Sequence, residues 1–235
     1  YLVPFVEEML GFSIRPEDTV VGNQTHNIPQ PNIEDHFFKA VETQFESDQF
    51  SIDEKDRLVH SHGQLSVDEI YRILYGSSLE RVVDLVFFPQ SEEDVKGIIE
   101  LANEHNVCLI PYGGGTNVSG ALAIPTEEER MVVSVDMQRM NRIIWIDEEN
   151  FQACIEAGIM GKQLEKLLGE QGYTSGHDPD SIEFSTLGGW IATNASGMKK
   201  NRYGNIEDIV IEATLVTPTG NIETKCITPR NSTGI

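Results

Sequence analysis

Basic residues are scarce in this chain of 235 residues. Lysine and arginine together number 17, against 38 aspartates and glutamates, which gives a formal net charge of −21. Sequence-independent binding to nucleic acid requires a basic surface, so the composition argues against nucleic-acid partners. Long apolar runs are also missing, since no stretch approaches the roughly 18 residues that a membrane-spanning helix needs. Hydrophobic residues still make up 39% of the chain, which supports a packed core.

Cysteine is rare as well. The three cysteines, Cys108, Cys154 and Cys226, are far apart in the sequence and odd in number. Cys108 and Cys154 lie within strand-like runs, so we expect them to be buried thiols of a reducing compartment. Their spacing argues against a disulfide framework and against a zinc site, and we predict no metal ligands in this chain.

Glycine, by contrast, is concentrated at one point. Residues 111–120, hereafter the glycine loop, read Pro-Tyr-Gly-Gly-Gly-Thr-Asn-Val-Ser-Gly and follow an apolar run over 107–110. Three consecutive glycines allow a tight turn and a close approach of a ligand to the backbone amides. Successive amides of such a turn form an anion-binding nest, and Thr116, Asn117 and Ser119 add side-chain donors. A phosphate or pyrophosphate is the expected ligand, and a plain turn between strands is the alternative.

Two familiar phosphate-binding motifs do not fit the glycine loop. A Walker loop requires a lysine after its last glycine, and none follows here. The dinucleotide fingerprint G-x-G-x-x-G fails because Val118 or Asn117 stands where a glycine belongs. Pro125 and several acids follow Gly120, so we expect no helix N-terminus to support the loop. These absences argue against both P-loop and Rossmann proteins.

The remaining pattern predicts an α+β fold. A strand over 82–88, a helix opened by Ser91 and a strand over 107–110 form a βαβ unit with the glycine loop at its carboxyl end. Further elements are expected as follows: short strands over 131–136, 142–147 and 151–158, a helix over 161–172, and a strand over 207–218 with a hairpin turn at 218–221. Residues 1–35 are expected to be mostly irregular. We divide the chain into an N-terminal, partly irregular and helical region (residues 1–80) and a second domain (residues 81–235).

Residues 177–205 combine polar groups with small residues. A histidine and three acids open the segment, and the bases Lys199, Lys200 and Arg202 lie near its end. A helix cap at Ser185 or Thr186, followed by a small-residue packing face, explains part of the pattern. It does not explain why a histidine, acids and bases occur together, so we expect this segment to contact a ligand.

The glycine loop, residues 180–186 and residues 193–196 together resemble the flavin-binding half of the vanillyl-alcohol-oxidase-type flavoproteins. Within that group, residues 177–186 (His-Asp-Pro-Asp-Ser-Ile-Glu-Phe-Ser-Thr) and 195–208 (Ala-Ser-Gly-Met-Lys-Lys-Asn-Arg-Tyr-Gly-Asn-Ile-Glu-Asp) are similar to the alkylglycerone-phosphate synthase (alkyldihydroxyacetonephosphate synthase) family. The resemblance implies that residues 81–235 form an FAD-binding PCMH-type domain of two α/β subdomains. We expect this domain to be incomplete at its C-terminus, with a cap domain absent.

The resemblance also implies FAD as the cofactor. The residues that would hold FAD are Pro111, Tyr112, Gly113, Gly114, Gly115, Thr116, Asn117, Asp180, Ser181, Ile182, Glu183, Phe184, Ser185, Thr186, Thr193, Asn194, Ala195 and Ser196. Some relatives attach the flavin through a histidine at the position of Thr116. Threonine cannot form that bond, so we expect non-covalent FAD.

The implied reaction exchanges the acyl chain of acyl-dihydroxyacetone phosphate for a long-chain fatty alcohol, which forms the ether bond of ether lipids. It involves no net redox change and proceeds through a flavin adduct, so the cofactor supplies the difficult chemistry. His177 is the expected proton-transfer residue, because an imidazole titrates near neutral pH. A histidine that bonds a loop carbonyl is the alternative. The three bases either attract the substrate phosphate or lie on a solvated turn.

The resemblance further implies a peroxisomal homodimer with peripheral membrane association, although no targeting signal is visible. Two alternatives stay open: an FAD-dependent 2-hydroxy-acid dehydrogenase of the D-lactate type, and a non-catalytic FAD-binding fragment. We expect the chain alone to be inactive, because other active-site residues of the family lie in the cap domain. Gln64 stands where the family tends to have a second histidine, while His62 remains and is expected to be structural or to cap a helix.

Overall fold

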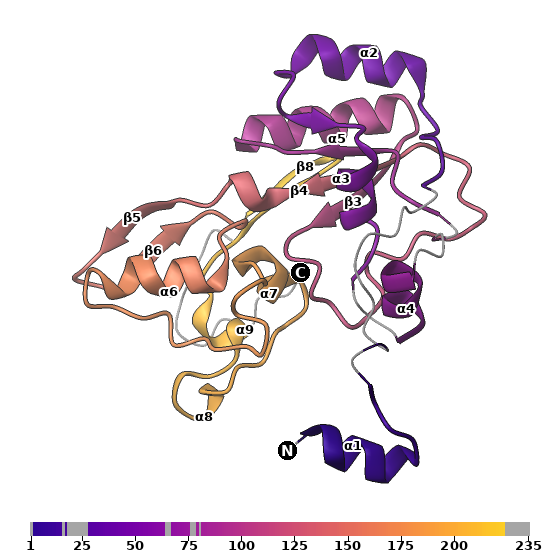
Figure 1. The fold of residues 1–235 in the computed structure, drawn as a ribbon. Helices are drawn as coiled ribbons and strands as arrows, with labels where there is room; N and C mark the ends of the chain where they lie inside the picture. Colours follow the sequence, from indigo (N-terminus) through magenta and orange to yellow (C-terminus); the bar gives the residue numbers. More distant parts are fainter. Residues whose placement is uncertain are drawn as a thin grey trace.

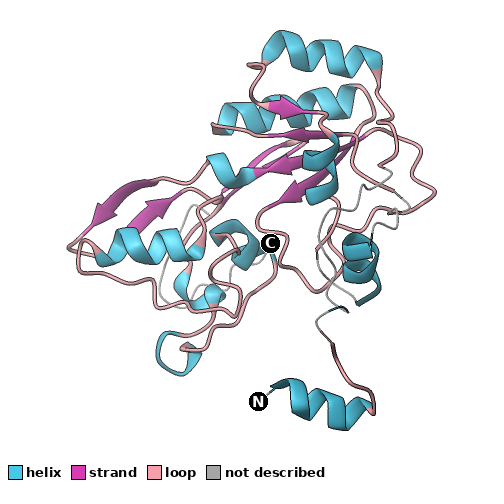
Figure 2. Cartoon of the chain, in the orientation of Figure 1, coloured by secondary structure: helices cyan, strands magenta, loops and turns pink. Residues whose placement is uncertain are grey.

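The computed structural model describes residues 2–15, 17, 28–63, 67–75, 79 and 81–223 of the chain. Gln64 and Cys226, discussed above, lie outside these residues. The chain forms a helix-covered sheet, followed by a hairpin with short helices, and α1 (Leu2–Leu10) lies apart from both (Figure 1). The predicted α+β fold class is confirmed by this mixture of helices and strands (Figure 2).

The first sheet has the strand order β1-β2-β4-β3. Its strands are β1 (Phe50–Ser51), β2 (Leu85–Phe87), β3 (Cys108–Tyr112) and β4 (Val132–Asp136). β2, β4 and β3 run parallel, whereas β1 pairs antiparallel with β2. The predicted βαβ unit is confirmed, and β4 inserts between its two strands. The last residues of β3 and β4, Tyr112 and Asp136, are therefore register partners at the carboxyl edge of the sheet.

Helices α2 (Asp35–Gln44) and α5 (Glu92–Glu104) cover one face of this sheet (Figure 1). The hydroxyl of Ser91 caps α5 by accepting a hydrogen bond from the Asp94 amide at 3.1 Å. Apolar side chains of both helices and of the strands form the first hydrophobic core, which includes Phe37, Val41, Leu85, Phe87, Ile98 and Val133. Residues before and after position 81 thus contribute to one core, while a domain boundary at 80/81 stays a prediction. Helices α3 (Glu54–Val59) and α4 (Val67–Tyr75) also precede this position.

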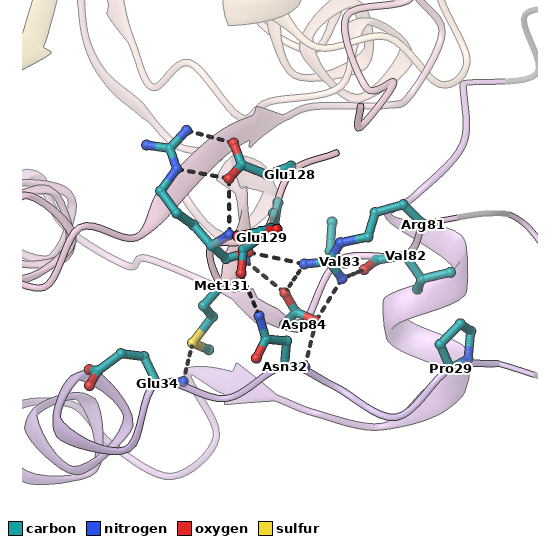
Figure 3. Close-up of polar contacts among 12 residues, drawn as sticks. Pro29, Asn32, Glu34, Arg81, Val82, Val83, Asp84, Glu128, Glu129 and Met131 are labelled. Atoms are coloured by element: carbon teal, nitrogen blue, oxygen red, sulfur yellow. Dashed lines mark hydrogen bonds and ion pairs between the residues drawn. The ribbon is translucent and has the colours of Figure 1, made fainter. Parts of the chain in front are cut away.

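The carboxylate of Asp84 links three separate segments where β2 begins (Figure 3). One of its oxygens accepts hydrogen bonds from the amide of Asn32 and from Nη1 of Arg81, each at 2.8 Å. The other accepts from Nη2 of Arg81 at 2.6 Å and from the amide of Val132 at 2.8 Å. Asp84 is fully buried, so these donors replace the water that its charge loses on folding.

The second part of the fold begins with the antiparallel strands β5 (Ile143–Asp147) and β6 (Gln152–Ile155). They are followed by α6 (Gly161–Gly169), α7 (Leu187–Ala192), α8 (Lys200–Tyr203) and α9 (Ile206–Ile209). The second hydrophobic core lies among these elements and includes Ile159, Leu164, Leu168, Trp190 and Ile206. The hairpin of β7 (Thr214–Thr217) and β8 (Gly220–Glu223) confirms the turn predicted at 218–221.

Three local predictions are wrong. α1 is helical where irregular structure is predicted, since Pro4 lies in the first turn, where a missing amide removes no intrahelical bond. The strand predicted over 207–218 begins only at β7, because a capping box of Asn205 and Asp208 starts α9 instead. The two cysteines predicted to be buried are not: Cys108 is half-buried and Cys154 is exposed. Cys154 lies in β6, a strand of a two-stranded hairpin in which three of four residues are exposed. None of the described helices has both the length and the apolar character needed to cross a membrane.

Replacing Asp84 by alanine is expected to lower the free energy of unfolding by about 3–5 kcal/mol, because Arg81 loses the partner of its charge. Urea-induced unfolding followed by circular dichroism measures the loss. Asp48→Ala is the control, since Asp48 pairs with Arg139 at 3.0 Å on the surface. The control is expected to lose less than about 1 kcal/mol. Equal losses in the two variants would contradict the linking role of Asp84.

Candidate functional site

The glycine loop leaves β3 at the carboxyl edge of the sheet. Gly115 has a φ of +66°, a left-handed conformation that favours glycine. Gln138 supports the turn, because its Nε2 donates a hydrogen bond to the carbonyl of Gly113 at 2.6 Å. Residues 113–130 contain no helix, as predicted, so an anion at this loop would meet backbone amides without the dipole of a helix.

The amides of residues 113–117 are the most direct sign of a ligand site. None of them donates a hydrogen bond to another residue that the structure describes. These residues are half-buried, and a half-buried amide without an acceptor is unfavourable unless water or a ligand provides one. An anion placed against successive amides would satisfy several of them at once.

The glycine loop packs against residues 184–186, a second segment predicted to bind the cofactor. A side chain at Gly114 would overlap the backbone carbonyl of Phe184, and one at Gly113 would overlap the hydroxyl of Thr186. Only glycine permits such a close approach of two backbones. Thr186 also begins α7, because its hydroxyl accepts a hydrogen bond from the Gly189 amide at 3.3 Å. The structure therefore brings these two predicted segments together.

His177 is buried beside Trp190 and Gly197. Its ring packs on Trp190 with centroids 4.9 Å apart, and a side chain built at Gly197 would lie 3.2 Å from its Nδ1. Neither ring nitrogen has a hydrogen-bond partner among the described residues, so the alternative of a histidine bonding a loop carbonyl is not what the structure shows. Burial lowers the pKa of His177 below its ordinary value, and the charges of Asp178 and Glu207 oppose this effect. The ring is therefore neutral near pH 7.

An open pocket of about 370 Å³ lies beside this histidine. It is lined by Asp180, Ser196, Gly197, Met198, Lys200 and Asn201. Lys199 instead pairs with Asp178, Nζ to Oδ2 at 3.2 Å, and the guanidinium of Arg202 stacks 5.0 Å from the ring centroid of Tyr203. Of the three predicted bases, Lys200 is thus the one that lines the pocket.

The other predicted residues differ in exposure. Tyr112 and Ser185 are buried; Thr116, Asn117, Ser181, Ile182 and Ala195 are half-buried; Pro111, Asp180, Glu183, Phe184, Thr193, Asn194 and Ser196 are exposed. The hydroxyl of Ser185 accepts a hydrogen bond from Nε1 of Trp190 at 2.7 Å, and that of Ser196 donates to Oδ1 of Asn205 at 2.6 Å. These two hydroxyls therefore support the fold locally.

Sequence reasoning missed the residues beneath the glycine loop. Asp136 ends β4, and its Oδ2 lies 2.9 Å from Nε2 of His60. Asp136 was detectable in principle, because the carboxyl ends of parallel strands meet at one edge of a sheet. His60 carries no such signal, since its place depends on how the segment after β1 folds back.

Residues 83–225 match the family described as FAD binding domain. Because this match covers more than half of the chain, the chain belongs to that family of flavin-binding proteins. FAD is therefore the cofactor, and the unpartnered amides of residues 113–117 fit the negative charge of its pyrophosphate. Within the family, the chain is 49% identical over 185 residues to alkyldihydroxyacetonephosphate synthase of Caenorhabditis elegans. That alignment covers 79% of this chain and 31% of the relative, so the chain spans about a third of the relative's length.

Solved structures agree with this assignment. An alkyldihydroxyacetonephosphate synthase has a TM-score of 0.82 and 42% identity, over 87% of this chain and 38% of that one. Among the sequence relatives, a mitochondrial D-lactate dehydrogenase of Arabidopsis thaliana is more distant, with 35% identity over 60% of this chain and 24% of the relative. The predicted resemblance to the synthase family is confirmed.

Gly114→Ala is expected to weaken FAD binding more than about tenfold, because the new methyl group meets the carbonyl of Phe184 and separates the loop from residues 184–186. Titration of the apoprotein with FAD, followed by flavin fluorescence, measures the dissociation constant. Gly169→Ala is the matched control, since its side chain would point into open space at the end of α6. Unchanged FAD affinity in Gly114→Ala would contradict the role of this contact.

Acid is expected to destabilise the chain through His177. The unfolded chain binds a proton near the ordinary pKa of 6.5, whereas the folded chain binds it only at lower pH. The stability contribution of neutral His177 is thus complete above that value and is lost as the pH falls below it. His177→Phe keeps a ring against Trp190, so its free energy of unfolding should fall less than that of the parent between about pH 7.5 and about pH 5. Urea unfolding at both pH values tests this, and equal falls would refute it.

Proposed function

We propose that this chain is the FAD-binding part of an alkyldihydroxyacetonephosphate synthase. The reaction exchanges the acyl chain of acyl-dihydroxyacetone phosphate for a long-chain fatty alcohol and so forms the ether bond of ether lipids. The observation that carries the proposal is the glycine loop, with its unpartnered amides, packed on residues 184–186. Identity of 49% to a synthase of that name supports the choice of reaction.

The described residues supply binding and proton transfer. Bound FAD supplies a reactive ring nitrogen for an exchange without net oxidation. The amides of residues 113–117 would hold its pyrophosphate, and residues 184–186 pack closely against Gly113 and Gly114 of the same loop. His177 is neutral and has no hydrogen-bond partner among the described residues, so it can take up or release a proton at a ring nitrogen. Lys200 lines the open pocket and provides positive charge for the phosphate of the substrate.

We also propose that FAD is held without a covalent bond. Thr116 occupies the position at which some relatives carry a flavin-linking histidine, and a threonine hydroxyl cannot form that link. Acid precipitation of the loaded protein is expected to release all flavin into the supernatant. Flavin absorbance that remains in the washed precipitate would overturn this proposal.

The cellular setting is a further proposal that rests on the family resemblance alone. It comprises a peroxisomal location, a homodimer and peripheral association with a membrane. The substrates, a lipid-like acyl ester and a fatty alcohol, make contact with a membrane surface chemically reasonable. We also propose that the chain by itself is inactive, because it spans only 31% of the length of the synthase to which it is compared.

The reaction can be tested in a chimera in which this chain replaces the matching third of the Caenorhabditis elegans synthase. With acyl-dihydroxyacetone phosphate and labelled hexadecanol, the chimera is expected to form a labelled ether product. His177→Phe in the same chimera should keep its flavin and lose about a hundredfold in rate, the usual effect of removing an acid–base group.

Three other outcomes would sink the proposal. Bound flavin without any ether product would favour a non-catalytic FAD-binding fragment over the transferase. Reduction of the flavin by D-lactate would favour the 2-hydroxy-acid dehydrogenase. Loss of flavin from the chimera, while the parent synthase retains it, would refute the proposed role of the glycine loop in holding FAD.

A further inference from the structure

His60 lies directly beneath the glycine loop, outside every segment assigned to cofactor binding above. It follows the last residue of α3 as the C-cap and is only 7% exposed. Its ring packs between two aromatic rings, with centroids 4.4 Å from Tyr112 and 5.9 Å from Phe88. Tyr112 is the residue from which the loop leaves β3. Most buried polar side-chain atoms in proteins have a hydrogen-bond partner.

Both nitrogens of His60 have partners. Nδ1 lies 2.7 Å from the backbone carbonyl of Asp56, and a carbonyl only accepts, so Nδ1 carries a proton. Nε2 lies 2.9 Å from Oδ2 of Asp136, the last residue of β4. The buried ring is thus held on both sides by polar partners from two different elements.

Two chains of contact lead from His60 to the loop. In the first, Oδ1 of Asp136 accepts a hydrogen bond from the backbone amide of Gln138 at 2.8 Å. The side chain of Gln138 then donates a hydrogen bond from Nε2 to the carbonyl of Gly113 at 2.6 Å. In the second, the ring of Tyr112 rests on His60 and supports Gly115. A side chain built at Gly115 would lie 2.9 Å from the Tyr112 hydroxyl. The two chains reach both ends of the triple glycine.

We propose that His60 is a positioning residue that holds the triple glycine in the shape that presents its amides to an anion. It never touches the ligand and acts through Asp136 and Tyr112. The inference rests on the proposed role of the loop as the pyrophosphate site of FAD. According to this proposal, α3, which lies before residue 81, contributes to the affinity for the cofactor through its C-cap residue.

The test compares His60→Phe with the matched control His105→Phe in the purified chain. His60→Phe keeps a ring against Tyr112 and loses both hydrogen bonds. His105 is a half-buried histidine in another part of the fold. It pairs with Glu34 at 3.6 Å and packs on Phe37 of the first core. We expect His60→Phe to weaken FAD binding about tenfold and His105→Phe to leave it unchanged.

A second readout does not require FAD. Backbone ¹⁵N order parameters of the three loop glycines should fall in His60→Phe from near 0.85, typical of rigid backbone, toward about 0.6, while those of β2 and β4 stay high. Gln138→Leu breaks only the last link to Gly113 and leaves the buried pair intact, so it serves where His60→Phe folds poorly. It should lower the order of Gly113 and weaken FAD binding in the same direction.

Unchanged loop order in both His60→Phe and Gln138→Leu would overturn the inference, as would equal losses in the His105→Phe control. A parent chain that binds no FAD would instead refute the proposed role of the loop. The order parameters would still decide whether His60 positions it, so the two failures are distinguishable.

Discussion

The buried carboxylate of Asp84 is the constraint on which the first half of the fold depends. It accepts hydrogen bonds from the segment before α2, from Arg81 and from the start of β4. Asp84 is fully buried, so without these donors its charge would be unpaired, at a penalty larger than any single contact offsets. The donors therefore fix where β2 and β4 begin. Because β3 and β4 are paired in parallel register, the same donors also determine where these strands end. Tyr112 and Asp136 therefore lie side by side at the carboxyl edge of the sheet.

That edge becomes a site because glycine brings two backbones into contact. Gly113 and Gly114 allow the loop to rest on residues 184–186, which belong to the second part of the fold. The site is thus shared between a loop of the first sheet and the start of α7. The pair of His60 and Asp136 supports it from below, so elements from three regions of the chain converge on a few amides.

Local signals in the sequence were sufficient for much of this. The Ser91 cap, the strand-like runs over 82–88 and 107–110, and the glycine run predict α5, the parallel strands β2 and β3 and the loop after β3, and each is present. The prediction failed over 206–209, where a capping box of Asn205 and Asp208 outweighs an alternating pattern. It also missed His60, because its partners lie four and 76 residues away, and no local pattern encodes the contact with Asp136. The contact between residues 113–114 and 184–186 is equally long-range. The residue patterns marked each segment separately as a ligand contact, and only the family resemblance assigned both to one cofactor.

The hydrogen-bond donors of the glycine loop are amides and hydroxyls, which carry no formal charge. Their lack of charge determines how salt affects the binding of an anion. A lysine or arginine site weakens in salt, because ions screen its attraction over about 8 Å at physiological ionic strength. Amide dipoles in contact with their ligand act at shorter range, where mobile ions do not enter. The long-range field here comes from a net charge of −21 and repels an approaching anion. Salt therefore screens the repulsion and leaves the attraction intact, so ionic strength favours the encounter between this protein and its anionic cofactor.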